Sequence, residues 1–528
     1  MTENTPSSEK PPTSPRPPRS LLKASGVTGS MTMVSRVLGL VREVVIARVF
    51  GVSDATDAFF LANRIPNFLR RLFAEGAFNQ AFVPVLSEYR SNHSHAEVRQ
   101  LVNAVAASLG LVLILITAAV VLLAPWVSIP IAYGYLDEPG KFELFVQMLR
   151  LTFPYLLLIS LTAFCGAILN SYDRFAVPAL TPALLNISLI GCAVLLAPYM
   201  ARPEMALAWG VLIAGVAQLL FQLPFLARIN LFPIPRFNRQ HEGLKRIMKL
   251  MVPALFGVSV SQINLLLDAF IASLLMSNAV SWLYYSDRLV ELPLGVFGVA
   301  IATVVLPIMS RKHAANSTGE FVQTLDWAMR LTCLVAIPAT LALIVMAEPL
   351  LITMFENDRF TAHDVDMVAG SLRAYAIGLV AFMGIKIFAP GYFARQDTRT
   401  PVRIGIIAMV ANMLLNIVLV FGFQMGHVGL ALATSLAAFL NAGLLAIGLW
   451  RLKLMRFQAV WTGFALRLLV ANTVMVIFLV WYMGEWQAWL EWDLASRLLQ
   501  LTVLCSGGII AYFGSLYISG LRIADLHK

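Results

Sequence analysis

The sequence predicts an all-α polytopic membrane protein with about 14 transmembrane helices. Of its 528 residues, 59% are hydrophobic and 13% are charged, whereas soluble domains average roughly 25% charged residues. Apolar stretches of about 20 residues, the length that crosses a bilayer, recur along the chain. Basic residues gather in alternate connections between these stretches. This alternation is typical of a chain that crosses the membrane many times.

The predicted membrane spans follow from the apolar stretches taken in order. They lie near 27–50, 56–88, 101–124, 144–170, 180–198, 206–227, 247–275, 279–309, 324–346, 368–394, 402–422, 428–450, 461–483 and 496–518. Several contain proline or glycine, for example Pro66, Gly76 and Pro84 in the second. Such breaks are tolerated in a membrane where protein or a water-filled cavity satisfies the freed backbone groups.

The orientation is predicted from the connections. The connection after the sixth span contains six basic residues between Arg228 and Lys249, whereas the connections after the ninth and thirteenth spans are acidic. Because basic loops stay in the cytoplasm, both termini are expected there. The net charge of +10 comes mostly from this bias and from the basic N-terminal leader. We therefore do not expect nucleic-acid binding.

Two pairs of similar stretches indicate an internal repeat. "FAEGAFNQAFVPVLS" at 73–87 aligns with "VFGVAIATVVLPIMS" at 296–310, and "LLNI" at 184–187 recurs at 414–417. The offsets, 223 and 230, predict two six-helix lobes that are pseudo-repeats of each other, with two further helices at the end. The predicted organisation is a disordered cytoplasmic leader at 1–22, an N-lobe at 23–230, a cytoplasmic inter-lobe loop at 231–245, a C-lobe at 246–455, and the two extra helices at 456–528.

Charged residues lie inside the predicted spans, chiefly in the first two spans of each lobe. The second span places Asn63, Asn67, Arg71, Glu75 and Asn79 four residues apart, which on a helix forms one polar stripe. A stripe of this kind faces water or a polar ligand inside the bundle. The basic set is Arg36, Arg42, Arg70, Arg71, Arg288 and Lys386, and the acidic set is Glu43, Asp57, Glu75, Asp268, Asp287 and Glu291.

Two interpretations of these charges stay open. They could pair internally and hold helices together, for example Glu43 with Arg36 or Arg42, and Arg288 with Asp287 or Glu291. Alternatively, they could line a cavity for an anion, since unpaired arginine at depth costs at least about 2.5 kcal/mol. The planar donor fork of arginine suits phosphate oxygens. Because Asp57 and Asp268 are expected toward the outer ends, the inner part is predicted to be net positive.

Oxygen-bearing side chains in three later spans form a candidate cation site. Asp268, Asn412, Asn416 and Thr434 could bind sodium, with hydrogen bonding between helices as the alternative role of the asparagines. No other metal site and no organic cofactor is expected. The four cysteines are isolated, and the seven histidines lie in loops or tails without a paired motif, so a membrane enzyme acting on lipid diphosphates is disfavoured.

Long stretches around these residues resemble the MurJ (MviN) family of lipid II flippases, within the multidrug/oligosaccharidyl-lipid/polysaccharide exporter superfamily. They are "SMTMVSRVLGLVREVVIARVFG", "ATDAFFLANRIPNFLRRLFAEGAFNQAFVPVL", "GVSVSQINLLLDAF", "SWLYYSDRLVELPLGVFGVA" and "APGYFARQDTRTPVRI". The resemblance runs from about residue 22 to the C-terminus. It leaves the first 20 residues outside.

The resemblance implies that lipid II, an undecaprenyl-diphosphate-linked peptidoglycan precursor, moves from the inner to the outer leaflet of the bacterial cytoplasmic (inner) membrane. It also implies alternating access without ATP. Because an anionic headgroup leaves a negative interior, we expect the membrane potential or an ion gradient to drive the cycle. Membrane lipids and the cell-wall synthesis machinery are the other expected partners. The last two helices would guide the lipid tail. The resemblance carries substrate-binding roles over onto Arg36, Arg42, Arg70 or its neighbour Arg71, Arg288 and Asp57. The other polar residues of the spans that we expect to bind substrate are Asn67, Glu75 and Lys386. An exporter of another lipid-linked oligosaccharide, or of drugs, is the alternative within the superfamily.

Overall fold

The computed structural model describes residues 19–238, 240–315, 317–455 and 460–521. Every regular secondary-structure element in these ranges is a helix, which confirms the predicted all-α class. The predicted leader lies outside the described residues except at its end, because the first helix begins at Arg19 rather than near residue 23. Helix boundaries are the least well determined feature of a sequence prediction, and an apolar stretch allows the first helix to extend toward the N-terminus.

The helices fall into three consecutive groups, which we call the N-half, the C-half and the terminal pair. The N-half contains α1 (Arg19–Phe50), α2 (Asp54–Leu69), α3 (Asn79–Asn92), α4 (His95–Leu122), α5 (Ala124–Ile131), α6 (Pro139–Thr152), α7 (Tyr155–Ser171), α8 (Ala176–Gly191) and α9 (Met205–Arg228). The C-half contains α10 (Glu242–Ser273), α11 (Ala279–Pro293), α12 (Val299–Ala314), α13 (Thr318–Val345), α14 (Ala347–Met354), α15 (Ala362–Phe393), α16 (Arg399–Asn416) and α17 (Gly426–Arg451). The terminal pair is α18 (Val460–Met483) and α20 (Leu494–Ile518), joined through α19 (Ala488–Glu491).

Eleven helical segments of the described chain are long and apolar enough to cross a membrane. The count of 14 also includes α1, the continuous helix formed by α2 and α3, and α10, which are not among the eleven. The fold class is therefore that of a multi-pass membrane protein, and the number 14 stays a prediction.

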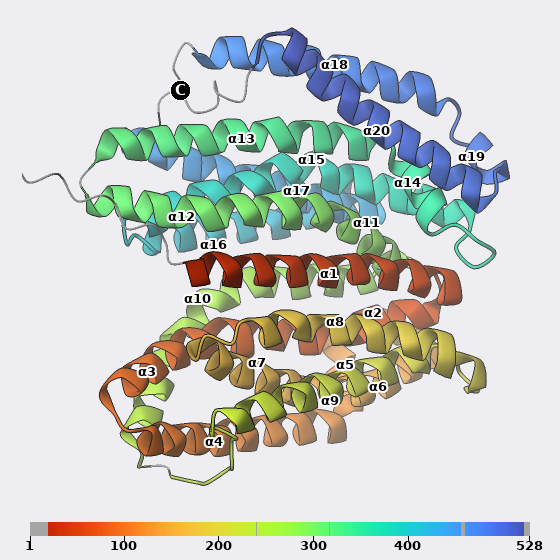
Figure 1. Cartoon of the computed structure of the whole chain (residues 1–528). Helices are drawn as coiled ribbons and strands as arrows, with labels where there is room; N and C mark the ends of the chain where they lie inside the picture. Colours follow the sequence, from red (N-terminus) through yellow and green to blue (C-terminus); the bar gives the residue numbers. More distant parts are fainter. Residues whose placement is uncertain (1–18, 239, 316, 456–459, 522–528) are drawn as a thin grey trace, which may run out of the picture.

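The other helices of the N-half and of the C-half lie on opposite sides of α1 and α10 (Figure 1). α1 packs along α8, while α10 contacts α3 of the N-half and α16 of the C-half. α2 contacts the start of α11. The helices that carry the membrane-embedded charges are therefore the ones through which the two halves meet.

The terminal pair packs outside α13 and α14 (Figure 1). Trp461 Nε1 donates to Asp326 Oδ1 of α13 at 2.6 Å, and Tyr512 OH donates to the Leu334 carbonyl at 2.7 Å. Toward the other end, Arg497 Nη1 lies 2.5 Å from Glu356 Oε2. These contacts attach the pair to the C-half along its length.

Four short π-helical segments interrupt the long helices of the described part of the chain. η1 (Arg70–Phe78) separates α2 from α3, and η5 (Leu294–Gly298) separates α11 from α12. The predicted repeat offset of 223 carries 70–78 onto 293–301, so the two interruptions occupy equivalent positions. η3 (Cys192–Leu196) and η6 (Ile417–Gly422) follow α8 and α16, the helices that carry the paired "LLNI" stretches.

The segment η1 lies within the predicted polar stripe. A π-helix closes i to i+5 hydrogen bonds in place of the i to i+4 hydrogen bonds of an α-helix. The regular α-helix for which the stripe was predicted therefore ends at Leu69, and the stripe beyond that residue stays a prediction. Such bulges are frequent at functional sites, and this one lies where the charged residues gather.

Candidate functional site

A buried carboxylate, Glu43 of α1, connects the N-half to α11 of the C-half. Its side chain is 4% exposed. Tyr284 OH donates to it at 3.0 and 3.1 Å from the two oxygens, and Arg288 Nε lies 3.8 Å from Oε1. Arg42 Nη2 also donates to Glu43 Oε1. We call Arg42, Glu43, Tyr284, Arg288 and Glu291 the arginine cluster.

Each arginine of the cluster has a second support. Arg42 Nη1 donates to Asn186 Oδ1 of α8 at 3.0 Å, and Asn186 Nδ2 donates to the Ser35 carbonyl at 2.9 Å. Arg288 Nη1 lies 2.6 Å from Glu291 Oε2, and its guanidinium lies 4.9 Å from the Tyr284 ring centroid. Tyr284 itself stacks on Phe60 of α2 with centroids 3.8 Å apart. The guanidinium groups are thus held in place by three different helices.

Arg42 and Arg288 are paired internally, which is one of the two interpretations that the sequence allows. Both have a carboxylate partner, so the simple expectation of unpaired positive charge does not hold for these two. The side chains of Arg288 and Glu291 are nevertheless 34% and 42% exposed. Their pair can exchange partners with an incoming anion at lower cost than a fully buried pair, whose disruption costs about 3–5 kcal/mol.

Arg36 differs from Arg42, because it makes no hydrogen bond or ion pair with the described part of the chain. It lies against η5, so closely that a Cβ atom at Gly295 would clash with Arg36 Nη1. Glycine at 295 therefore leaves room for this guanidinium beside the interruption in α11–α12. Arg36 remains the clearest candidate for an anion ligand among the predicted residues.

The other predicted residues divide into three cases. Asn67 Oδ1 accepts from Arg70 Nε at 3.3 Å and so orients Arg70, while Arg71 is held by contacts of its own. The side chain of Glu75 lies outside what the structure describes. Lys386 of α15 is exposed and makes no hydrogen bond or ion pair with the described residues, so the structure does not join it to the arginine cluster.

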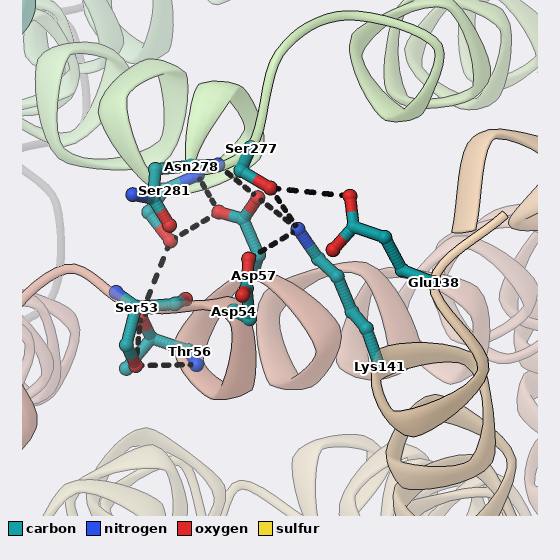
Figure 2. Close-up of polar contacts among 9 residues, drawn as sticks. All are labelled: Ser53, Asp54, Thr56, Asp57, Glu138, Lys141, Ser277, Asn278 and Ser281. Carbon is teal, nitrogen blue, oxygen red and sulfur yellow. Dashed lines mark hydrogen bonds and ion pairs between the residues drawn. The ribbon is translucent and has the colours of Figure 1, made fainter.

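Asp57 has a different environment from the arginines. It is 1% exposed and belongs to a set of polar residues that joins α2, α6 and the start of α11 (Figure 2). Ser281 N and Oγ donate to Oδ1 at 2.7 and 2.5 Å, and Asn278 N donates to Oδ2 at 2.8 Å. Lys141 Nζ lies 3.5 Å from Oδ2. We call Asp57, Lys141, Ser277, Asn278 and Ser281 the Asp57 cluster.

The geometry makes Asp57 the N-terminal cap of a helix in the other half. The first N–H groups of an α-helix lack partners within the helix, and Asn278, the residue before α11, provides no side-chain cap. The carboxylate of Asp57 accepts two of these N–H groups from outside. Lys141 Nζ donates to Asp54 Oδ1 at 2.8 Å and to Ser277 Oγ at 3.3 Å, which closes the set.

The predicted cation residues come together around Asp268 of α10. Asn412 Nδ2 and Asn416 Nδ2 donate to Asp268 Oδ1 at 3.1 and 2.8 Å, and Thr434 Oγ1 lies 3.5 Å from Oδ2. Asn264 Nδ2 donates to Oδ2 at 3.3 Å. The oxygens of both α16 asparagines are buried without a partner in the described chain. Rotating these amides would turn two further oxygens toward a cation, so the residues fit either of the predicted roles.

Several contributors to these clusters were missed at the sequence level, among them Ser277, Asn278, Ser281, Lys141 and Asn186. Lys141 lies just before the fourth predicted span, where a single lysine near a connection attracts no attention. Asn186 carried a usable signal, because the "LLNI" repeat pairs it with Asn416. In both halves this asparagine binds a membrane-embedded charge, Arg42 in one and Asp268 in the other.

Comparison with known proteins now places this geometry in a family. The sequence matches the family model described as Lipid II flippase MurJ over residues 46–500. The chain belongs to the lipid II flippase MurJ family. It is 47% identical over 513 residues to a probable lipid II flippase MurJ of Vibrio cholerae, which covers 96% of this chain and 97% of that protein. It is 41% identical over 516 residues to a lipid II flippase MurJ of Burkholderia cenocepacia, covering 97% and 99%.

Solved structures agree with the family. One described as lipid II flippase MurJ in an inward closed conformation has a TM-score of 0.78 at 28% identity and covers 93% of this chain and 98% of its own. An inward-facing multidrug resistance transporter of the MATE family, from the MOP superfamily, has a TM-score of 0.66 at 14% identity, covering 81% and 97%, which shows a shared fold. The family relatives are named as flippases, which are transporters rather than enzymes. The membrane-spanning helices and the family together make the chain a multi-pass protein of the inner membrane.

Proposed function

We propose that this chain carries lipid II from the inner to the outer leaflet of the bacterial cytoplasmic membrane. Family membership supports the substrate, and the arginine cluster is the observation that carries the proposal. Arg42 and Arg288 approach the same buried carboxylate from opposite halves, and Arg36 lies nearby on α1. Arginine binds phosphate oxygens through paired N–H donors, so a diphosphate is the anion that this arrangement suits.

Binding would proceed by exchange of partners. The Arg288 and Glu291 side chains are partly exposed, and a diphosphate that reaches Arg288 would replace Glu291 as its partner. Arg36 and Arg70 would add donors from α1 and η1. Glu43 would remain between Arg42 and Arg288, where it limits the charge of the empty site. The long isoprenoid tail stays in lipid, and the exposed apolar surface of the terminal pair is its proposed path.

The Asp57 cluster supports alternating access between two lobes. It joins α2 and α6 to the start of α11 and so closes one end of the contact between the halves. By the predicted loop orientation, with both termini in the cytoplasm, this end faces outside. Opening toward the outer leaflet would then require Asp57 to release the N–H groups of α11. The exported precursor would be delivered to the cell-wall synthesis machinery on that side.

The proposed energy source is the membrane potential, which is worth roughly 2.3 kcal/mol per charge per 100 mV. An anionic headgroup that leaves a negative interior moves down this potential, and a cationic empty site returns toward it. Sodium at the Asp268 cluster is a second proposed contribution. The two are separable, because only the second depends on Asp268.

The proposal is tested with the full-length protein in vesicles that contain lipid II in the inner leaflet. Arg42→Ala should reduce the rate of lipid II arrival in the outer leaflet at least tenfold. Arg48→Ala is the matched control, because Arg48 lies on the same helix with an exposed side chain. Equal rates for both variants would contradict the proposal, and faster transfer of a different lipid-linked oligosaccharide than of lipid II would favour the alternative exporter.

A further inference from the structure

A cavity of about 680 Å³ lies within the N-half, and every described residue that lines it belongs to that half. Its walls come from α3, α7, α8 and α9, with Arg70 of η1 at one side. This volume is in the range of pockets that enclose a small organic ligand, about 300–1,000 Å³. The polar part of the lining includes Asn79, Asn170, Thr181, Gln218 and Gln222. Arg70 is the only charged residue among the described residues that line it.

Hydrogen bonds to α8 orient the side chains of two glutamines in the interior part of α9. Gln218 and Gln222 are 2% and 1% exposed. Gln222 Nε2 donates to Thr181 Oγ1 at 2.9 Å, and Gln218 Nε2 donates to the Thr181 carbonyl at 3.2 Å. Tyr155 OH donates to Gln218 Oε1 at 3.3 Å. Two long amide side chains are thus fixed on one face of α9, one turn apart.

Two residues that line this cavity each have an acceptor without a donor. Gln222 Oε1 and Asn79 Oδ1 are buried, with almost no exposed surface, and accept no hydrogen bond within the described chain. A buried acceptor without a partner costs about 1–3 kcal/mol, so turning either oxygen into the cavity, toward a donor on a ligand, would recover that cost. The ligand should therefore carry hydroxyl or amide N–H groups.

Arg70 relates the cavity to the proposed diphosphate site. It lines the cavity, and it belongs to the predicted anion-binding set. The cavity also borders α8 at Leu185, one residue before Asn186, which accepts the hydrogen bond from Arg42. A diphosphate held by Arg70 would therefore place the group attached to it at the cavity.

We propose that this cavity is the subsite for the neutral N-acetylated sugar portion of the headgroup, next to the diphosphate. The inference rests on the proposed function, which supplies the diphosphate and its attached glycan. Sugar hydroxyl and acetamido N–H groups provide the donors that Gln222 and Asn79 lack. The stem peptide fits less well, because its carboxylates and amine would meet only one charged residue, Arg70. The cavity would thus give the transporter selectivity for the glycan, which the arginines alone cannot provide.

The test measures binding of three lipids to the full-length protein in nanodiscs. The probes are undecaprenyl diphosphate, the same lipid carrying the disaccharide without a peptide, and complete lipid II. Gln222→Met keeps the side-chain length and removes the amide. We expect it to weaken binding of both glycan-bearing lipids about tenfold and to leave binding of undecaprenyl diphosphate within twofold. Thr117→Val is the matched control, since it removes another buried oxygen without a partner from the N-half, outside the cavity. It should change none of the three affinities.

Other outcomes would overturn the inference. If Gln222→Met weakened the binding of all three lipids equally, or of none, the glycan subsite would be ruled out. If it weakened the binding of complete lipid II alone, the cavity would be assigned to the peptide instead. Asn79→Leu, with the thermal unfolding transition as a check, gives an independent second variant if Gln222→Met fails to fold. Arg42→Ala should weaken binding of all three lipids. If Arg42→Ala left all three affinities unchanged, the diphosphate site itself would be wrong. This result is distinct from the results that would rule out only the glycan subsite.

Discussion

Replacing Asp57 with asparagine removes one charge from the contact that joins the two halves and changes the volume of the side chain little. In the structure its carboxylate accepts three hydrogen bonds from Asn278 and Ser281, at 2.5 to 2.8 Å. Asparagine keeps one acceptor oxygen, while its amide nitrogen would face a backbone N–H group. The variant should therefore destabilise the closed arrangement of α2 and α11 and favour the arrangement that is open at this end.

The size of the effect follows from the interactions that asparagine cannot make at this position. A hydrogen bond to a charged group is worth about 1.5–3 kcal/mol, and a negative charge at a helix N-terminus adds about 0.3–1 kcal/mol. Together these give about 2–4 kcal/mol against the closed arrangement. Since about 1.4 kcal/mol is a factor of ten, the population of the open arrangement should rise about 30- to 700-fold.

The assay places a reporter cysteine at Val280, which is 2% exposed in the closed arrangement. The native cysteines, Cys165, Cys192, Cys333 and Cys505, are first replaced. An impermeant thiol reagent added outside intact cells should label Val280→Cys much faster when Asp57→Asn is present. Asp54→Asn is the matched control, because Asp54 pairs with Lys141 but makes no hydrogen bond or ion pair with α11 in the described chain, and its side chain is 54% exposed. An exposed ion pair is worth up to about 1 kcal/mol, so labelling should rise less than about fivefold.

Equal labelling rates in the Asp57→Asn variant and the parent would refute the reasoning, since the carboxylate would then contribute nothing to closure. Equal acceleration by Asp54→Asn and Asp57→Asn would refute it in another way. It would assign the effect to the general loss of negative charge near Lys141, rather than to the cap that Asp57 places on α11.

Three further predictions concern charge, topology and energy. Arg36→Ala and Arg288→Ala should each abolish lipid II export in cells while membrane insertion persists, and Arg36→Lys should restore export only in part because lysine lacks the paired donors; normal export by both alanine variants would refute the anion site. Export by the reconstituted protein should stop when an ionophore collapses the membrane potential, even with ATP present, and Asp268→Asn should remove any sodium dependence while lipid II binding survives; export that responds to neither potential nor sodium would leave only passive exchange. Cysteines that replace Asp358 and Glu491, on the predicted outer loops, should react with an impermeant reagent in intact cells. Cysteines that replace Asn238 and Lys453, on the predicted inner loops, should not react. A reversed pattern would overturn the predicted orientation.

Much of the fold could be predicted because a membrane restricts the possible structures so strongly. Apolar length and loop charge are local properties, and they located the ends of the long helices to within about six residues, except for the start of α1. The four π-helical segments were not predicted, since a change from four to five residues per hydrogen-bonded turn leaves no mark in composition. The stripe from Asn67 to Glu75 was accordingly predicted for a regular α-helix, whereas the structure has a π-helical segment from Arg70 onward.

The candidate site was predicted in part for a related reason. Arginine in an apolar stretch is conspicuous, so Arg36, Arg42 and Arg288 stood out. Their partners depended on contacts between distant segments, and only the folded chain shows that Glu43 meets Tyr284, 241 residues away. Neutral amides such as Gln222 attract no attention in a sequence, because a buried glutamine becomes notable only when its oxygen is found without a donor.

The balance of charge in the arginine cluster bears on how an empty transporter can return. A site built only of buried arginines would bind a diphosphate tightly, but it would be costly to leave empty, since each unpaired charge at depth is unfavourable. Glu43, held by Tyr284 from the other half, offsets that cost in the empty state. It also opposes a bound anion, which weakens binding and favours release. Replacing Glu43 should therefore strengthen lipid II binding and slow its release, so that export falls although affinity rises.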